Sequence, residues 1–317
     1  MTLRRLGVPL REGASPRGDA RRKTAIAFAL DRDYLEPFRV MVYSMVRAHT
    51  MLDAPVYVYS DDPAVFDDEI VTRIADRTIL IEGKDLRELE EVAEHHIRRA
   101  ERAKWNRGTC LKWAVFDEAP VDQILFLDVD MLVLRPLEGF LSLHPRSALV
   151  CCEQFQRQQL AGEDERLPKD EVARRLELLI DRESPHGGRI NSGVMLVRKP
   201  LLNRTARAAI IAFARTRTDV NEQGILTYFF RRDPLGKALR MAMSSSAYNF
   251  QENYFDLIDE LDALRLMRRI RVLHYAGSQK PWEVRESKLG RLTLQLWFRY
   301  RLLAGEIPAS LGQAAEA

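Results

Sequence analysis

The segment Gln123 to Leu134 reads QILFLDVDMLVL, and the interpretation of the whole chain starts from it. Apart from Gln123 and two aspartates, every residue is apolar, which is typical of a strand buried on both faces of a parallel sheet. We expect one strand that runs from Gln123 through Asp128 and Asp130 to Leu134. Two ionised carboxylates inside such a strand are costly unless something compensates their charge.

A hard divalent cation supplies that compensation, because Mg²⁺ and Mn²⁺ prefer oxygen ligands. In open α/β sheets, ligands also bind at the carboxyl ends of the strands. The alternative is that Asp128 and Asp130 face solvent, since residues two apart in a strand share a face. Phe126 and Leu132 take up that same face, which favours the metal site.

Strand and helix patterns alternate on both sides of this segment. This order predicts an α/β fold, in which helices flank a mostly parallel central sheet. The predicted strands are 24–30, 56–59, 78–81, 148–152, 190–197 (interrupted at 191–193) and 270–274. The predicted helices are 35–46, one beginning at 61–63, and 86–104, 111–118, 170–179, 202–216, 222–231 and 292–297.

We find no internal repeat and no low-complexity linker, so the pattern predicts a single domain. Residues 1–23 are expected to be a disordered basic tail, because they carry many arginines and few large apolar residues. A membrane-surface anchor is the alternative for this tail. The domain itself is expected over 24–288, and residues 289–317 are expected to form a C-terminal helix and tail.

Composition excludes several classes of protein. Hydrophobic residues make up 46% of the chain and charged residues 30%, as in a soluble globular protein. The net charge of +3 does not indicate a nucleic-acid partner. No segment is apolar for the ~18 residues of a membrane span. Cys110, Cys151 and Cys152 form no disulfide framework, so we expect a cytoplasmic protein, with contact at the cytoplasmic face of the membrane left open.

Polar side chains also interrupt apolar patterns elsewhere. His274 ends a predicted strand and Lys280 follows it, and a metal ligand and a phosphate-binding cation are of these types. Asn191-Ser192-Gly193 alone indicates a turn more than a site, and Asn221 alone indicates a helix cap before Glu222. A hydrogen-bonded histidine at the end of a strand is the plain alternative for His274.

Taken together, these segments resemble glycosyltransferase family 8, the retaining family that includes glycogenin and bacterial lipopolysaccharide galactosyl- and glucosyltransferases. The segment ILFLDVDMLVL is similar to the family's metal-binding D-x-D strand, and RINSGVMLV is similar to its N-[SA]-G-V strand. NEQGILTYFF resembles the glycogenin-type D-Q-G-I-L-N segment, and VLHYAGSQKPW resembles H-x-x-G-x-x-K-P-W. The resemblance covers about residues 24 to 283 and implies a single Rossmann-like domain of GT-A type.

The resemblance also implies a role for each matching position. Asp128, Asp130 and His274 would ligate Mn²⁺ or Mg²⁺, which bridges the phosphates of a UDP-sugar donor. Glu222, Gln223 and Lys280 would form the catalytic set, with Lys280 on the diphosphate. The residues expected to bind the donor and its metal are Ala29, Asp31, Tyr34, Lys112, Asp128, Val129, Asp130, Asn191, Ser192, Gly277 and Lys280.

The implied reaction moves a hexose, glucose or galactose, from a UDP-sugar to an acceptor hydroxyl and retains the anomeric configuration. Glu222 and Thr227 depart from the family, which usually has Asp and Asn there. The segment Leu30 to Asp33 also lacks the asparagine often found before the tyrosine.

Two other functions remain open from the sequence. A haloacid-dehalogenase-type phosphatase also carries D-x-D after an apolar strand. That family has Thr or Val at the position of Leu132. A sugar-nucleotide-binding protein without catalysis is the second. The acceptor can be a glycan, a lipid-linked sugar or a protein, with 153–188 as an acceptor-side loop or a plain surface insertion. A homo-oligomer is also left open.

Overall fold

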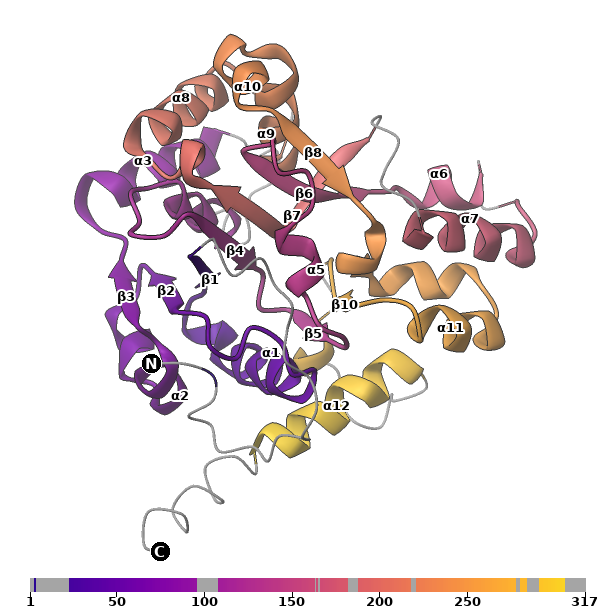
Figure 1. Cartoon of the computed structure of the whole chain (residues 1–317). Helices are drawn as coiled ribbons and strands as arrows, with labels where there is room; N and C mark the ends of the chain where they lie inside the picture. Colours follow the sequence, from indigo (N-terminus) through magenta and orange to yellow (C-terminus); the bar gives the residue numbers. More distant parts are fainter. Residues whose placement is uncertain are drawn as a thin grey trace, which may run out of the picture.

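A computed structural model of the chain describes residues 3, 23–95, 108–162, 164, 166–181, 188–217, 221–277, 280–283 and 291–305. The predicted basic tail, residues 96–104 of the predicted charged helix and part of the segment 153–188 therefore lie outside the described residues. The centre is a seven-stranded sheet in the order β3-β2-β1-β4-β7-β6-β8 (Figure 1). Its strands are β1 (Thr24–Ala29), β2 (Val56–Ser60), β3 (Arg77–Leu80), β4 (Gln123–Leu127), β6 (Leu149–Gln154), β7 (Arg189–Arg198) and β8 (Met241–Ser244).

The strands of this sheet run mostly in one direction. β3, β2, β1 and β4 are parallel neighbours, and β6 pairs with β8 in parallel. β7 pairs antiparallel with both β4 and β6, so of the seven strands it is the reversed one. The predicted α/β fold with a mostly parallel central sheet is therefore confirmed.

Helices cover both faces of the sheet because its strands are apolar on both sides. In β1, Ile26 and Phe28 face one core, where Phe28 meets Phe38 of α1 edge to face with the ring centroids 5.1 Å apart. Ala25 and Ala27 face the second core, which is shared with α3, α8 and α9. The helices are α1 (Leu35–Arg47), α2 (Glu69–Ile74), α3 (Gly83–His95), α5 (Glu138–Leu141), α6 (Arg157–Ala161), α7 (Lys169–Asp181), α8 (Arg204–Arg215), α9 (Glu222–Arg232), α10 (Pro234–Leu239), α11 (Glu260–Met267) and α12 (Leu292–Gly305).

A second, three-stranded sheet consists of β5 (Met131–Val133), β10 (Val272–His274) and β9 (Phe250–Gln251), in the order β5-β10-β9. The predicted single strand from Gln123 to Leu134 is therefore wrong. The backbone changes partners across 128–130: the Asp128 N–H donates to the Gly193 carbonyl of β7, and the Tyr275 N–H donates to the Asp130 carbonyl. Both strands are uniformly apolar, so periodicity could not locate the bend that separates them.

Two other predicted elements differ. The predicted helix 111–118 ends early, as a 3-10 helix Lys112–Val115, and Phe116 leaves the helical conformation with a ψ of +57°. The predicted interruption in strand 190–197 does not break β7, which is continuous. The irregularity is instead a shift in the register between β6 and β7. Cys151 lies opposite Met195, whereas the next residue, Cys152, lies opposite Asn191.

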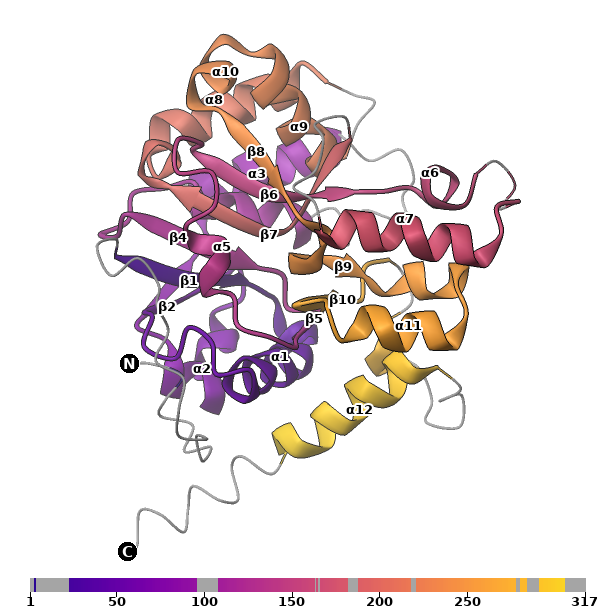
Figure 2. The same cartoon turned by 45° about the vertical axis from the view of Figure 1, so that its right-hand side comes forward.

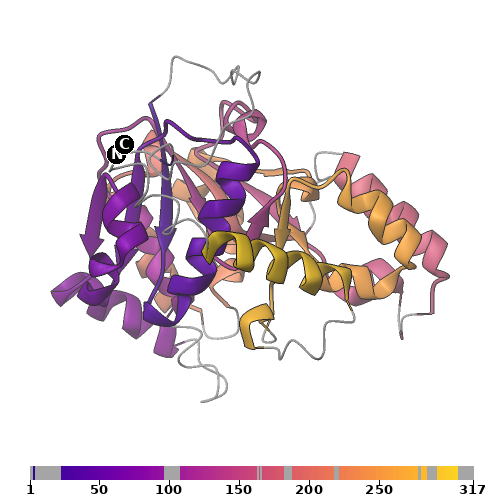
Figure 3. The ribbon, with the colours of Figure 1, turned by 90° about the horizontal axis from the view of Figure 1, so that it is seen from below.

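The C-terminal helix α12 lies along α1, as the view from below shows (Figure 3). Tyr300 of α12 meets Tyr43 of α1 edge to face with centroids 6.0 Å apart, and Trp297 belongs to the same core as α1. Beyond the second sheet, helices α7 and α11 contact each other and lie side by side (Figure 2). Among the described residues, no helix is both long and apolar enough to cross a membrane.

Candidate active site

A cavity of about 530 Å³ lies where the carboxyl ends of β1 and β4 meet the second sheet. It is lined by residues from segments that are far apart in the sequence. The lining includes these predicted site residues: Ala29, Asp31, Tyr34, Lys112, Asp128, Val129, Asp130, Asn191, Glu222, Gln223, His274, Gly277 and Lys280. Ser192 is behind the lining, where its hydroxyl accepts a hydrogen bond from the Lys112 ammonium.

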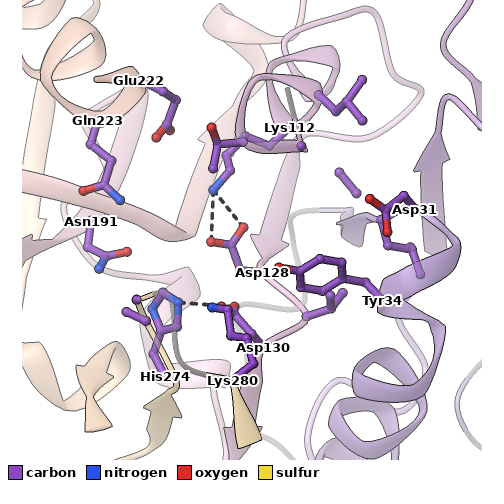
Figure 4. Close-up of a pocket in the computed structure, with 18 of the residues that line it drawn as sticks. Asp31, Tyr34, Lys112, Asp128, Asp130, Asn191, Glu222, Gln223, His274 and Lys280 are labelled. Carbon is purple, nitrogen blue, oxygen red and sulfur yellow. Dashed lines mark hydrogen bonds and ion pairs between the residues drawn. The ribbon is translucent and has the colours of Figure 1, made fainter. Parts of the chain in front are cut away.

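The bend 128–130 brings two carboxylates and an imidazole together (Figure 4). One ligand atom each from Asp128, Asp130 and His274 lies within 4.8 Å of the others. Lys280 donates to Asp130 Oδ2 at 2.6 Å and to the Tyr275 carbonyl at 2.9 Å. Burial alone would raise the pKa of Asp130, but the Lys280 ammonium and the His274 imidazole outweigh it and hold that pKa well below the usual range.

The donor chemistry of this cluster fits a divalent cation. His274 Nδ1 lies 2.8 Å from Asn249 Oδ1, an acceptor, so Nδ1 carries a proton. Nε2 faces Asp130 Oδ1, 3.2 Å away. A cation between these two atoms would be ligated by both, and a second hydrogen bond that fixes the ring is usual for metal-bound histidine.

Lys112 neutralises the other aspartate. Its ammonium lies 2.8 Å from Asp128 Oδ1 and 3.3 Å from the Ser192 hydroxyl, and its side chain is buried. Burial would lower the pKa of Lys112, but Asp128 and the nearby Glu222 outweigh burial and raise it, so Lys112 stays charged. The cluster therefore has one lysine beside each aspartate.

Ala29, Asp31 and Tyr34, which the sequence predicts to bind the donor, lie at the end of β1. Asp31 caps the 3-10 helix Arg32–Tyr34 by accepting from the Asp33 N–H at 3.0 Å. Tyr34 projects toward the aspartates (Figure 4), and its ring meets Trp282 edge to face with centroids 5.5 Å apart. Burial, followed by the negative charge of Asp130, raises the pKa of the Tyr34 phenol, so it remains a neutral hydrogen-bonding group.

The N-terminus of α9 forms the wall beside β7. Asn221 caps it by accepting from the Gly224 N–H at 3.1 Å, as its helix-cap interpretation predicted. Glu222 Oε1 and Gln223 Oε1 are buried and have no hydrogen-bond partner. Burial raises the pKa of Glu222, and Lys112 offsets part of that effect. Thr227, a departure from the family pattern, joins α9 to β7 by accepting from the Ile190 N–H at 3.1 Å.

Gly277 lines the cavity between His274 and Lys280. Its φ of +112° is a conformation that L-residues other than glycine rarely adopt. A substitution there would strain the backbone three residues before Lys280, the partner of Asp130. The glycine therefore belongs to the geometry of the site, whatever it contacts.

Several lining residues were not predicted from the sequence. Gln154 ends β6, Gln251 lies on β9, and Asn253 lies in the 3-10 helix Glu252–Leu257. β9 has two residues, which is too short to show a strand period. The available signal was the cluster of polar residues in YNFQENY, the segment that also contains Asn249, the partner of His274.

Known proteins match the chain by family and by fold. The model of glycosyl transferase family 8 matches residues 25–285, and no curated protein matches the chain. The solved structure of glycosyltransferase GlyE from Streptococcus pneumoniae TIGR4 is 18% identical with a TM-score of 0.54, and the match covers 92% of this chain. The chain spans 64% of that structure's own length.

A second solved structure, galactosyltransferase LgtC in complex with donor and acceptor sugar analogs, is 17% identical. Its TM-score is 0.55, and the match covers 89% of this chain and 95% of that chain. At this identity the two structures support the GT-A type fold, while the family model supports membership. From residue 25 to residue 285, the chain belongs to glycosyl transferase family 8.

Proposed function

We propose that the protein is a retaining, metal-dependent hexosyltransferase, which moves glucose or galactose from a UDP-sugar to an acceptor hydroxyl. One observation carries the proposal: Asp128, Asp130 and His274 converge in a cavity in which Lys112 and Lys280 are beside the aspartates. The family of the chain supports it. The three thiols, free and buried, are compatible with a reducing cytoplasm.

The cluster would hold Mn²⁺ or Mg²⁺ through Asp128, Asp130 and His274. When bound, the ion stabilises the negative charge that builds on the departing diphosphate. Lys280 is the residue best placed to add to that stabilisation, because its ammonium is buried at the same cluster. Gly277 lines the cavity and has no side chain, so it is placed to let the diphosphate approach the backbone closely.

The remaining donor contacts are assigned by their place in the cavity. Ala29, Asp31 and Tyr34 would hold the nucleoside at the end of β1. Asn191, Glu222 and Gln223 would face the hexose, since the unpaired oxygens of Glu222 and Gln223 can accept from sugar hydroxyls. Lys112 and Ser192 hold Asp128 and Glu222 in position from behind.

In the transfer, the acceptor oxygen bonds to the anomeric carbon while the bond from that carbon to the diphosphate breaks. UDP leaves with the electron pair of that bond, and the proton that the acceptor hydroxyl releases passes to an oxygen of the departing diphosphate or to solvent. Retention requires either a carboxylate nucleophile or attack on the face from which UDP leaves. Glu222 is the carboxylate at the sugar end, and Gln223 is the neighbouring polar group of the same helix N-terminus.

A panel of sugar nucleotides tests the proposal, with UDP release measured with and without Mn²⁺. We expect release from UDP-glucose or UDP-galactose that is lost when a chelator removes the metal. UDP that binds tightly with no turnover, across many acceptors, would indicate a binding protein instead. Hydrolysis of p-nitrophenyl phosphate in the same buffer would indicate the phosphatase.

A further inference from the structure

The proposed donor contacts leave one side of the cavity unused. Gln154 at the end of β6, Gln251 on β9 and Asn253 beyond β9 line this side, and we call these three residues the amide wall. All three side chains are uncharged amides, each with donors and an acceptor. They come from segments about a hundred residues apart, yet they face the same cavity.

Gln251 is directed into the cavity by strand pairing. It lies opposite His274 in the parallel pair β9–β10, and paired residues of neighbouring strands point to the same face. The residue is 4% exposed, and its Nε2 is buried without a hydrogen-bond partner. Asn253 Oδ1 is likewise buried without a partner. A buried donor and a buried acceptor in one cavity are complementary to a ligand that carries hydroxyl groups.

The amide wall is held in place by a tyrosine behind it. The Tyr254 hydroxyl donates to the Phe155 carbonyl at 3.0 Å and accepts from the Phe155 N–H at 3.1 Å. Phe155 follows Gln154 and Tyr254 follows Asn253, so these two bonds join the two segments of the wall. Groups that are positioned before the ligand arrives lose less entropy on binding.

Strand order separates the amide wall from the nucleoside end. In the second sheet, His274 of β10 lies between β5, which follows Asp130, and Gln251 of β9. The proposed nucleoside residues are at the end of β1, on the other side of Asp128 and Asp130. A donor with its diphosphate at the metal cluster would therefore leave the amide wall for the molecule that receives the sugar.

Charge restricts what that molecule can be. The described lining has six carboxylates (Asp31, Asp33, Asp128, Asp130, Glu222 and Glu283) and two lysines. Both lysines are paired with aspartates, and no described residue of the amide wall is cationic. The described cation that contacts the wall, Arg157, donates to the Asn253 carbonyl at 3.4 Å and pairs with Asp256 at 3.7 Å. Carboxylates therefore outnumber cations in the described lining, and they would repel an anionic acceptor.

We infer that the amide wall is the acceptor subsite and that the acceptor is an uncharged sugar, with hydroxyls bound by Gln251 Nε2 and Asn253 Oδ1. The inference rests on the proposed transfer from a UDP-sugar. It narrows the acceptors left open by the sequence to a neutral carbohydrate, free or as the exposed end of a longer glycan.

The experiment compares acceptor probes on the full chain with Mn²⁺ and the active UDP-sugar. Methyl β-glucoside, methyl β-galactoside and lactose are the neutral probes. Glucose 6-phosphate, glucuronic acid and a tyrosine-containing peptide are the contrasting probes. We expect product, detected by mass spectrometry, from at least one neutral sugar and none from the contrasting probes.

Gln251→Leu then tests the wall, because leucine keeps the size and removes the amide. We expect kcat/KM for the neutral acceptor to fall roughly three- to tenfold, the effect of one lost hydrogen bond, chiefly through KM. The KM for the UDP-sugar should change by less than about twofold. The matched control Gln158→Leu, at an exposed position on α6, should change neither value.

A thermal melt separates a binding role from a structural one. Because Gln251→Leu removes a buried donor that has no partner, its Tm should equal or exceed that of the natural protein. A lower Tm with an unchanged acceptor KM would overturn the inference. So would a raised KM for the UDP-sugar with the acceptor KM unchanged, because Gln251 would then contact the donor hexose.

Two outcomes with the probes distinguish the inference from the function beneath it. Metal-dependent UDP release with transfer to the peptide or to a charged sugar, or to no neutral sugar at high concentration, overturns the acceptor assignment alone. Absence of UDP release from every sugar nucleotide overturns the proposed transferase itself.

Discussion

The two carboxylate oxygens of Asp130 have different partners. Oδ2 is paired with the Lys280 ammonium, and Oδ1 faces His274 Nε2. Replacing it with alanine removes a proposed metal ligand and leaves the lysine charge without its partner. We predict that Asp130→Ala lowers Mn²⁺-dependent UDP release at least about a hundredfold, because even residues that only support metal ligands change metal affinity 10- to 100-fold. The assay is UDP release, with Mn²⁺ binding measured in the presence of UDP.

Two controls accompany that variant. Asp170→Ala, at an exposed position on α7, makes the same chemical change away from the cavity and should keep full activity. A thermal melt of Asp130→Ala shows whether the buried, unpaired Lys280 has unfolded the protein, since such a charge is destabilising. Full Mn²⁺-dependent activity in a folded Asp130→Ala protein would contradict the assignment.

Glu222 gives a prediction that depends on pH. Burial raises the pKa of this carboxyl above its unfolded value of about 4.3. The protonated side chain therefore stabilises the folded state at low pH, and that contribution is lost as pH rises through the folded pKa. Glu222→Gln is neutral at every pH, so its Tm relative to the natural protein should increase as pH rises above the unfolded value of about 4.3, by about 2–4 °C for each kcal/mol.

Melts for this comparison are made with chelator present, so that a bound metal does not alter the charge near Glu222. Gln223→Glu is not a suitable control because it adds a charge to the same wall. The exposed Glu260→Gln at the start of α11 is suitable, and its Tm difference should not depend on pH. A constant difference for Glu222→Gln would mean that the carboxyl ionises as it does in the unfolded chain.

At the level of single residues, the sequence predicted two kinds of site residue: charged residues that are costly to bury, and residues that belong to a family motif. Asp128 and Asp130 stood out because carboxylates are costly among apolar neighbours, and His274 and Lys280 followed from the motif that resembles the family's. Gln251 and Asn253 gave no such signal, because a neutral amide is ordinary in a loop. Their placement depends on the pairing of β9 with β10, which no local pattern specifies.

At the level of elements, the sequence did not predict the junction of the two sheets. It also did not predict the short elements β8, β9, α5, α6, α10 and α11. The strands and helices of the parallel half were predicted because buried strands and amphipathic helices have distinct periods. The bend at 128–130 depends on long-range backbone bonds to β7 and to Tyr275, so it appears only when the whole chain is folded. That bend places Asp128 and Asp130 beside His274, although the segment around them is apolar.

Gly193 tests how closely the two sheets must approach there. A Cβ at this position would lie 2.7 Å from His274 Cε1 and 2.6 Å from Met131 Cε, closer than real side-chain contacts. We predict that Gly193→Ala displaces the His274 ring and weakens Mn²⁺ binding in the presence of UDP roughly 10-fold or more, by analogy with other changes that disturb a metal ligand. Titration calorimetry measures the effect.

The matched control for this variant is Gly305→Ala at the end of α12, where an added Cβ meets nothing within 4 Å. It should leave Mn²⁺ binding unchanged. If Gly193→Ala also binds Mn²⁺ normally, then β7 can move away from His274 without cost, and the proposed role of this close approach in positioning the ligand would be wrong.

At the scale of the whole molecule, α12 connects the outside of the fold to the cavity. Trp297 is 1% exposed and meets Trp282 with ring centroids 5.8 Å apart, and Trp282 in turn meets Tyr34. Both Trp282 and Tyr34 line the cavity. The helix that the sequence placed in a separate C-terminal segment therefore packs against Trp282, and Trp282 contacts Tyr34, one of the residues proposed to hold the nucleoside.

Trp297→Ala should consequently affect both folding and donor binding. Loss of a fully buried tryptophan typically lowers the free energy of unfolding by about 3–5 kcal/mol, and the freed space would let Trp282 and Tyr34 shift, so UDP affinity should also fall. Leu302→Ala on the same helix is the control, because Leu302 is 70% exposed and surface changes usually stay within about 0.5 kcal/mol. Melts and UDP calorimetry measure the two effects separately. A large loss of stability with unchanged UDP affinity would show that α12 supports the fold but not the site, because the tryptophan pair would then not transmit its packing to Tyr34.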